Sequence, residues 1–182
     1  MGKYNVNINR TIEETEVLLM MTRIGNPRDR ALLATLYLTG GRPIEIQKIK
    51  AKDINLQIEE DPNYFSIKLS TAKLRERKGF EVRERTLEIH RNAPFADELL
   101  RYTSGLPDDA SLFNISTTRM RQIIYKASDK KVCLYSFRHS RIWKVMRGYG
   151  DAAAMYWKGA TDIRSLNPYI RAKPIGRKLD IT

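Results

Sequence analysis

Only one region of the chain alternates between apolar and polar residues as a half-buried strand does. Residues 64–70 (YFSIKLS) and residues 80–89 (FEVRERTLEI) both alternate with a period of two. The connector between them, residues 73–79 (KLRERKG), is charged and ends in glycine. This pattern predicts a single β-hairpin, so any sheet in the fold is small and must pack against helices.

Helix start and stop signals divide the rest of the chain. Thr11 and Glu14 have the spacing of a capping box, and Asn26 precedes Pro27 as an N-cap precedes a proline at the first helical position. Ser116 is a further N-cap candidate. The predicted helices cover approximately residues 12–24, 27–39, 43–49, 94–104, 117–127, 135–146 and 151–157. We therefore expect a mainly α fold with a small antiparallel β-sheet (α+β), forming one domain over residues 1–182.

The positive charge of the chain is concentrated in its last third. The net charge is +12, yet residues 1–118 hold 18 basic and 17 acidic side chains, whereas residues 119–182 hold 15 basic and 4 acidic ones. Such segregation favours a polyanionic partner, and nucleic acid is the first choice. The alternative is a solvated basic face that serves solubility. A membrane partner is not expected, because no apolar run approaches the roughly 18 residues of a membrane span and no predicted helix pairs a basic face with a broad exposed apolar one.

The cysteine and histidine content restricts both compartment and metal chemistry. Cys133 is the only cysteine, which excludes an intramolecular disulfide and a cysteine-based zinc site and suits a reducing cytoplasm. The two histidines, His90 and His139, are too few for a histidine-rich metal site. The N-terminus lacks the apolar stretch of a secretory signal. We therefore expect a cytoplasmic protein with no metal.

Four stretches carry residues suited to phosphate chemistry. Arg42 follows the helix stop at residues 40–41, and Glu45 lies one helical turn later, where it can orient the arginine. Arg138 lies in the stretch YSFRHS, Tyr169 follows Gly159 by ten residues, and a lysine falls in the hairpin connector. Taken singly, these are a surface ion pair, a basic helix face, a structural tyrosine and a solvated turn lysine.

In this order the four stretches resemble the tyrosine recombinase (phage integrase) family. Residues 39–54 (TGGRPIEIQKIKAKDI) are similar to its first arginine box, and residues 135–140 (YSFRHS) to its second, with Tyr135 where most members have histidine. The spacing from Gly159 to Tyr169 matches the last box, in which Ala160 replaces a histidine or tryptophan, and Pro168 directly before the tyrosine is a further departure. The resemblance covers residues 12–171.

The resemblance implies a reaction and a role for each residue. Tyr169 attacks a DNA phosphodiester to form a 3′-phosphotyrosyl intermediate, while the guanidinium groups stabilise the negative charge that builds on the non-bridging phosphate oxygens. The lysine Lys73, with Lys78 as the alternative, protonates the departing 5′ oxygen. The implied catalytic residues are Arg42, Lys73, Tyr135, Arg138 and Tyr169, and the supporting ones are Glu45, His139, Gly159 and Ala160. No cofactor is implied, because the phosphotyrosyl bond conserves the energy of the broken ester.

The resemblance also implies double-stranded DNA as the partner. The expected phosphate contacts are the basic residues Arg119, Arg121, Lys126, Lys130, Lys131, Arg141, Lys144 and Arg147. Only some 30 residues precede the first arginine box, so we expect the family's N-terminal core-binding domain to be absent, with a short basic tail at residues 170–182. We expect a monomer in free solution and a homo-oligomer on DNA. The alternatives are a catalytically impaired DNA-binding member and a type IB topoisomerase-like enzyme.

Overall fold

The first helix begins later than the sequence predicts. The computed structural model describes residues 11–70, 84–160, 162–167 and 169, and within them α1 spans Glu14–Thr22. Its N-cap is Glu13, paired with Glu16, so the capping box predicted from Thr11 and Glu14 is wrong. The cause is tertiary, because the backbone N–H of Ile12 donates to the hydroxyl of a serine 128 residues away. That bond holds the chain extended up to the cap.

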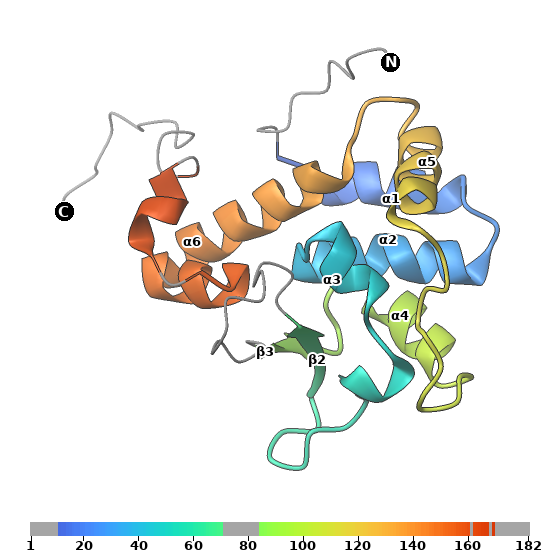
Figure 1. Cartoon of the computed structure of the whole chain (residues 1–182), viewed down its shortest axis with the longest axis horizontal. Helices are drawn as coiled ribbons and strands as arrows, with labels where there is room; N and C mark the ends of the chain where they lie inside the picture. Colours follow the sequence, from blue (N-terminus) through green and yellow to red (C-terminus); the bar gives the residue numbers. More distant parts are fainter. Residues whose placement is uncertain (1–10, 71–83, 161, 168, 170–182) are drawn as a thin grey trace, which may run out of the picture.

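Helix α2 is the central element of the fold. It spans Pro27–Thr39, with Asn26 as the N-cap that accepts a hydrogen bond from the backbone of Arg28, as predicted. Every residue from 31 to 39 is buried, and the helix packs against α1, α4, α5 and α6 (Figure 1). It ends at Gly40 in the left-handed conformation, and the five-residue helix α3, Pro43–Gln47, follows at once.

The sheet has three antiparallel strands in the order β1-β2-β3. Strand β2 spans Tyr64–Ser70 and pairs with β3, Glu84–His90, which confirms the hairpin. The hairpin connector, including both candidate lysines, lies outside the described residues. Strand β1, Ile54–Asn55, was not predicted, because two residues after the short 3-10 helix Ala51–Asp53 are too few to show an alternation.

The second half of the described chain is helical. Helix α4 spans Ala96–Thr103, and α5 spans Thr117–Ala127 with Ser116 as its N-cap, as predicted. Two helices were predicted over residues 135–146 and 151–157, and the structure confirms both as the two arms of one element, α6, Leu134–Lys158. This element is kinked at Gly150, whose φ of 85° and ψ of −179° are not helical, and it turns back on itself there (Figure 1). A 3-10 helix, Ile163–Leu166, follows.

Two apolar clusters hold these elements together. The larger is built around α2 and includes the inward faces of the sheet and of α5. The smaller joins both arms of α6 to the last described segment through residues such as Ile142, Ala154, Leu166 and Tyr169. The second cluster therefore fixes the end of the described chain against α6. Within the described part of the chain, no helix is both long and apolar enough to cross a membrane.

Gly40 gives a test of how closely α2 and α6 approach. Its φ is +58°, and a Cβ there would lie 2.7 Å from Arg141 Cβ. We expect Gly40→Ala to lower the free energy of unfolding by about 2–4 kcal/mol, from backbone strain plus overpacking. Urea denaturation measures this. Gly25→Ala is the matched control, because nothing lies within 4 Å of that position, and it should have little effect. Equal stability of the two variants would contradict the close approach.

Candidate active site

The junction between α2 and α3 positions the first arginine. Arg42 is the N-cap of α3, and Glu45 is the third residue of that helix. The carboxylate of Glu45 accepts hydrogen bonds from the backbone N–H of Arg42 at 2.9 Å and from its Nη1 at 2.6 Å. A Cβ at Gly41 would lie 2.6 Å from Ile46 Cδ1, so a larger residue at this turn would displace that buried side chain. The predicted pairing of Arg42 with Glu45 is therefore present in the structure.

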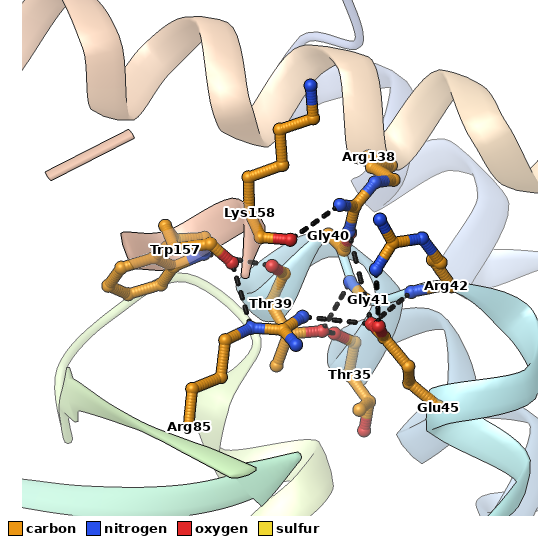
Figure 2. A network of polar contacts seen from close by, with 10 residues as sticks. All are labelled: Thr35, Thr39, Gly40, Gly41, Arg42, Glu45, Arg85, Arg138, Trp157 and Lys158. Atoms are coloured by element: carbon orange, nitrogen blue, oxygen red, sulfur yellow. Dashed lines mark hydrogen bonds and ion pairs between the residues drawn. The ribbon is translucent and has the colours of Figure 1, made fainter. Parts of the chain in front are cut away.

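Glu45 lies at the centre of a group of arginines. It is fully buried, and besides Arg42 it contacts Arg85 Nη2 at 2.8 Å and Arg138 Nη1 at 3.9 Å (Figure 2). Burial alone would raise the pKa of this carboxyl, but the hydrogen bonds and charges of Arg85 and Arg42 lower that pKa to about 2. Glu45 is therefore ionised and orients all three guanidinium groups.

Arg138 reaches this group from α6. Its Nη1 donates to the carbonyl of Gly40 at 3.0 Å, and its Nη2 donates to the carbonyl of Lys158 at 2.8 Å. Burial, followed by the charge of Arg42, lowers the pKa of Arg138 to about 10. The guanidinium is thus held by main-chain oxygens from two elements, beside the first arginine although 96 residues separate the two in sequence.

Arg85 is the member of the group that the sequence interpretation missed. It lies on β3 with only 5% of its surface exposed, donates from Nε to the carbonyl of Trp157 at 3.0 Å, and has a buried Nη1 without a hydrogen-bond partner. A Cβ on Gly159 would lie 2.9 Å from that Nη1, so this glycine makes room for the arginine. The signal was present in the sequence, because Arg85 precedes Leu87 and Ile89 on the inward face of an alternating strand.

Tyr169 lies against α6 close to the arginines. Its ring stacks on His139 with centroids 4.8 Å apart, and Lys158 Nζ lies 4.9 Å from the Tyr169 ring centroid. Burial raises the pKa of the phenol, while the charges of Arg138 and Arg42 act to lower it. The phenol is therefore protonated at neutral pH, within electrostatic reach of both arginines.

The other predicted site residues are less closely connected. Tyr135, at the start of α6, is 54% exposed, and none of the contacts described in the structure joins it to the arginines. His139 is buried with Nε2 unpaired, and burial lowers its pKa. Ala160 follows the left-handed C-cap Gly159, and its backbone N–H bonds Met155. The roles assigned to these residues, and to Lys73, stay predictions.

The basic residues predicted to contact DNA divide into two groups. Six of them are exposed, and three of these, Arg119, Lys126 and Lys130, line a surface hollow beside the α1–α2 turn. In contrast, Arg141 donates from Nε and Nη2 to the carbonyl of Tyr37, and Lys144 lies over the Tyr37 ring. These two side chains face the protein interior and join α6 to α2. The six exposed residues are Arg119, Arg121, Lys126, Lys130, Lys131 and Arg147.

The arginine group carries a positive charge that its only carboxylate does not balance. Among the described residues, Arg42, Arg85 and Arg138 face Glu45 as the one acidic side chain that pairs with them. An excess of cationic donors fixed at one place suits an anion such as a phosphodiester. Across the described residues, no group of three or more His, Cys, Asp or Glu side chains is arranged to hold a metal ion.

Glu45→Gln tests the central carboxylate. Its folded-state pKa lies below the unfolded value, so its contribution to stability is present above pH 4.5 and is lost as the pH falls towards 2. We expect the variant to be less stable by about 3 kcal/mol at neutral pH, with the difference from wild type shrinking on acidification. Urea denaturation across this pH range measures both. The exposed pair partner Asp97, changed to Asn, is the control and should cost little. A Glu45→Gln protein as stable as wild type at pH 7 would overturn the assignment.

We compared the sequence and the structure of the chain with those of known proteins. No protein-family model and no curated protein matches the sequence. Among solved structures, XerH site-specific recombinase bound to its difH substrate, in a pre-cleavage complex, matches 90% of this chain with a TM-score of 0.64 at 17% identity. XerA recombinase matches 93% with a TM-score of 0.65 at 18% identity. The post-cleavage complex of XerH with a palindromic difH substrate matches 91% of this chain with a TM-score of 0.65 at 14% identity.

The matches cover 50% of each XerH chain and 61% of XerA, so this chain spans about half to three fifths of those proteins. The chain has the fold of a tyrosine recombinase catalytic domain.

Proposed function

We propose that this chain is the catalytic domain of a site-specific DNA recombinase (integrase) that cleaves and rejoins DNA by transesterification through a 3′-phosphotyrosyl intermediate. The observation that carries the proposal is the convergence of Arg42 and Arg138 on the carboxylate of Glu45, with Tyr169 beside them. This likeness in fold to recombinases is consistent with the same chemistry. We also propose that residues 1–182 form a single catalytic domain.

The two arginines would bind the non-bridging oxygens of one phosphate. Guanidinium groups are planar, permanently charged and able to donate two parallel hydrogen bonds, which matches the charge that builds on those oxygens during attack. Glu45 fixes Arg42 through two hydrogen bonds, and main-chain carbonyls fix Arg138. Donors held in this way lose little freedom when the phosphate binds.

Tyr169 would be the nucleophile. Its oxygen forms a bond to phosphorus as the bond from phosphorus to the 5′ oxygen breaks. Because burial keeps the pKa of the phenol above its ordinary value, the phenol is protonated beforehand, and its proton passes to solvent water during attack. The departing 5′ oxygen takes a proton from Lys73, the general acid in this proposal. The reverse steps rejoin the strand.

The exposed basic residues of α5 and the turn after it would contact the DNA backbone. Phosphate contacts of this type position the protein and carry little sequence information. XerH was solved on its difH substrate, and for the present chain we propose double-stranded DNA as the partner. We further propose a monomer in free solution and a homo-oligomer on DNA.

The nucleophile assignment is tested with a suicide substrate, a nicked duplex that traps the covalent intermediate. We expect Tyr169→Phe to abolish the covalent protein–DNA band and to leave DNA affinity almost unchanged, because only the attacking oxygen is removed. Tyr149→Phe is the matched control, since that ring is 81% exposed on α6, and it should still form the band. Persistence of the band in Tyr169→Phe would move the nucleophile elsewhere.

The same assay separates the alternatives. A wild-type chain that binds DNA without forming any covalent band would be a catalytically impaired binder, the reading that Tyr135 and Ala160 favour. A chain that forms the band and relaxes supercoiled plasmid without exchanging strands would be a type IB topoisomerase-like enzyme.

DNA affinity should fall steeply with salt. If the six exposed basic residues each contact a phosphate, the association constant should drop about a thousandfold between roughly 50 and 200 mM salt. Lys126→Ala and Lys130→Ala should each reduce the log–log salt slope by about one. Fluorescence anisotropy measures the slope. Arg101→Ala, on α4 and paired with Asp97, is the control that should leave it unchanged. A salt-independent affinity would contradict the proposal.

A further inference from the structure

Lys158 connects the last described segment to the arginine group. It is the final residue of α6, and its carbonyl accepts the hydrogen bond from Arg138 Nη2 (Figure 2). Its ammonium extends away from Glu45, donates to the carbonyl of Ser165, and lies 4.9 Å from the ring centroid of Tyr169. One residue thus holds a phosphate-binding arginine through its main chain and the tyrosine segment through its side chain.

The surroundings of this ammonium are unusual for a lysine. None of the ion pairs described in the structure joins it to a carboxylate, and its partners are a main-chain carbonyl and an aromatic ring. Burial, followed by the charges of Arg138 and Arg42, lowers the pKa of Lys158 to about 8. An apolar side chain would avoid this electrostatic cost and would still pack against Tyr169.

The helix does not need the ammonium in order to end at this point. Gly159 adopts the left-handed conformation, and its backbone N–H bonds carbonyls of the preceding turn. Leu166 and Tyr169 are anchored by the smaller apolar cluster. The charge on Lys158 is therefore not explained by folding alone, and its contacts point to the alignment of Tyr169.

We propose that Lys158 is a positioning residue that aligns the Tyr169 phenol with the arginine-bound phosphate, by holding the 162–169 segment through its ammonium and Arg138 through its carbonyl. The inference rests on the proposed function and adds a residue to it. Lys158 forms and breaks no bond in the reaction. It acts on the rate of cleavage through the tyrosine, and the binding of DNA does not depend on it.

The first test compares Lys158→Met with Lys158→Arg in single-turnover cleavage of a suicide substrate. We expect Met to slow cleavage by about tenfold or more, because a small misplacement of a nucleophile has a large effect on rate. DNA affinity should stay within about twofold and resistance to urea should not fall, whereas Arg, which keeps a cationic donor, should restore most of the rate. Lys52→Met, on an exposed lysine paired with Asp109, is the matched control. A Met variant as fast as wild type, or one slowed only because it is unfolded, overturns the inference.

The pH profile gives a readout that a purely structural role would not move. Among the described residues, the charged and titratable groups facing Lys158 are Arg138 of α6, Arg42 at the start of α3, and Tyr169. The ammonium is present below its folded pKa and is lost as the pH rises through about 8. The wild-type cleavage rate should therefore lose this contribution above that pH, whereas Lys158→Arg should keep it. Identical profiles for the two proteins count against the inference.

A measurement without DNA keeps this inference separate from the proposed function. Hydrogen-exchange mass spectrometry should show faster exchange in peptides covering residues 162–169 in Lys158→Met than in wild type or Lys52→Met. Unchanged exchange overturns the inference whether or not the protein is active. Faster exchange in Lys158→Met, together with a wild-type protein that forms no covalent band, supports the positioning contact and rejects the recombinase activity.

Discussion

The arrangement of the site depends on one buried carboxylate. Glu45 accepts hydrogen bonds from arginines of α3 and β3 and lies 3.9 Å from the arginine of α6, so three elements distant in the sequence meet at one anionic group. A buried carboxylate is stable only when its charge is balanced, and the same balance keeps the guanidinium groups from dispersing into water. Glu45 orients the three guanidinium groups but neutralises only one of their charges. The remaining positive charge is available to an external anion.

Local signals in the sequence predicted the parts of the fold that local interactions determine. The Asn26-Pro27 start of α2, the Ser116 cap of α5 and strand β2 are all set by neighbouring residues, and the structure confirms them. The start of α1 could not be predicted from its own residues, because a hydrogen bond to Ser140 on α6 holds Ile12 extended.

The distribution of charge along the sequence could not show which basic side chains are exposed and which pack inside the protein. Arg141 and Lys144 contribute to the basic C-terminal third, yet they contact Tyr37 of α2, while Arg119 and Arg121 of the same third are exposed. Arg85 was overlooked for the opposite reason, since its partners Glu45 and Trp157 lie 40 and 72 residues away in the sequence. The candidate site was found through the order and spacing of motifs, and its charge balance became visible only in three dimensions.

The kink at Gly150 has a consequence for how the site is assembled. Arg138 and Lys158 belong to one helical element, and along a straight helix twenty residues would separate them by about 30 Å. They are instead joined by a hydrogen bond, because the backbone reverses at a torsion angle that only glycine adopts readily. Nothing lies within 4 Å of the position a Cβ would take there, so the requirement for glycine is purely torsional. Gly150 is remote from the chemistry, yet its backbone torsion angles set the direction of the second arm of α6. A small rotation there would move Trp157 and Lys158 together, away from the guanidinium groups that their carbonyls hold.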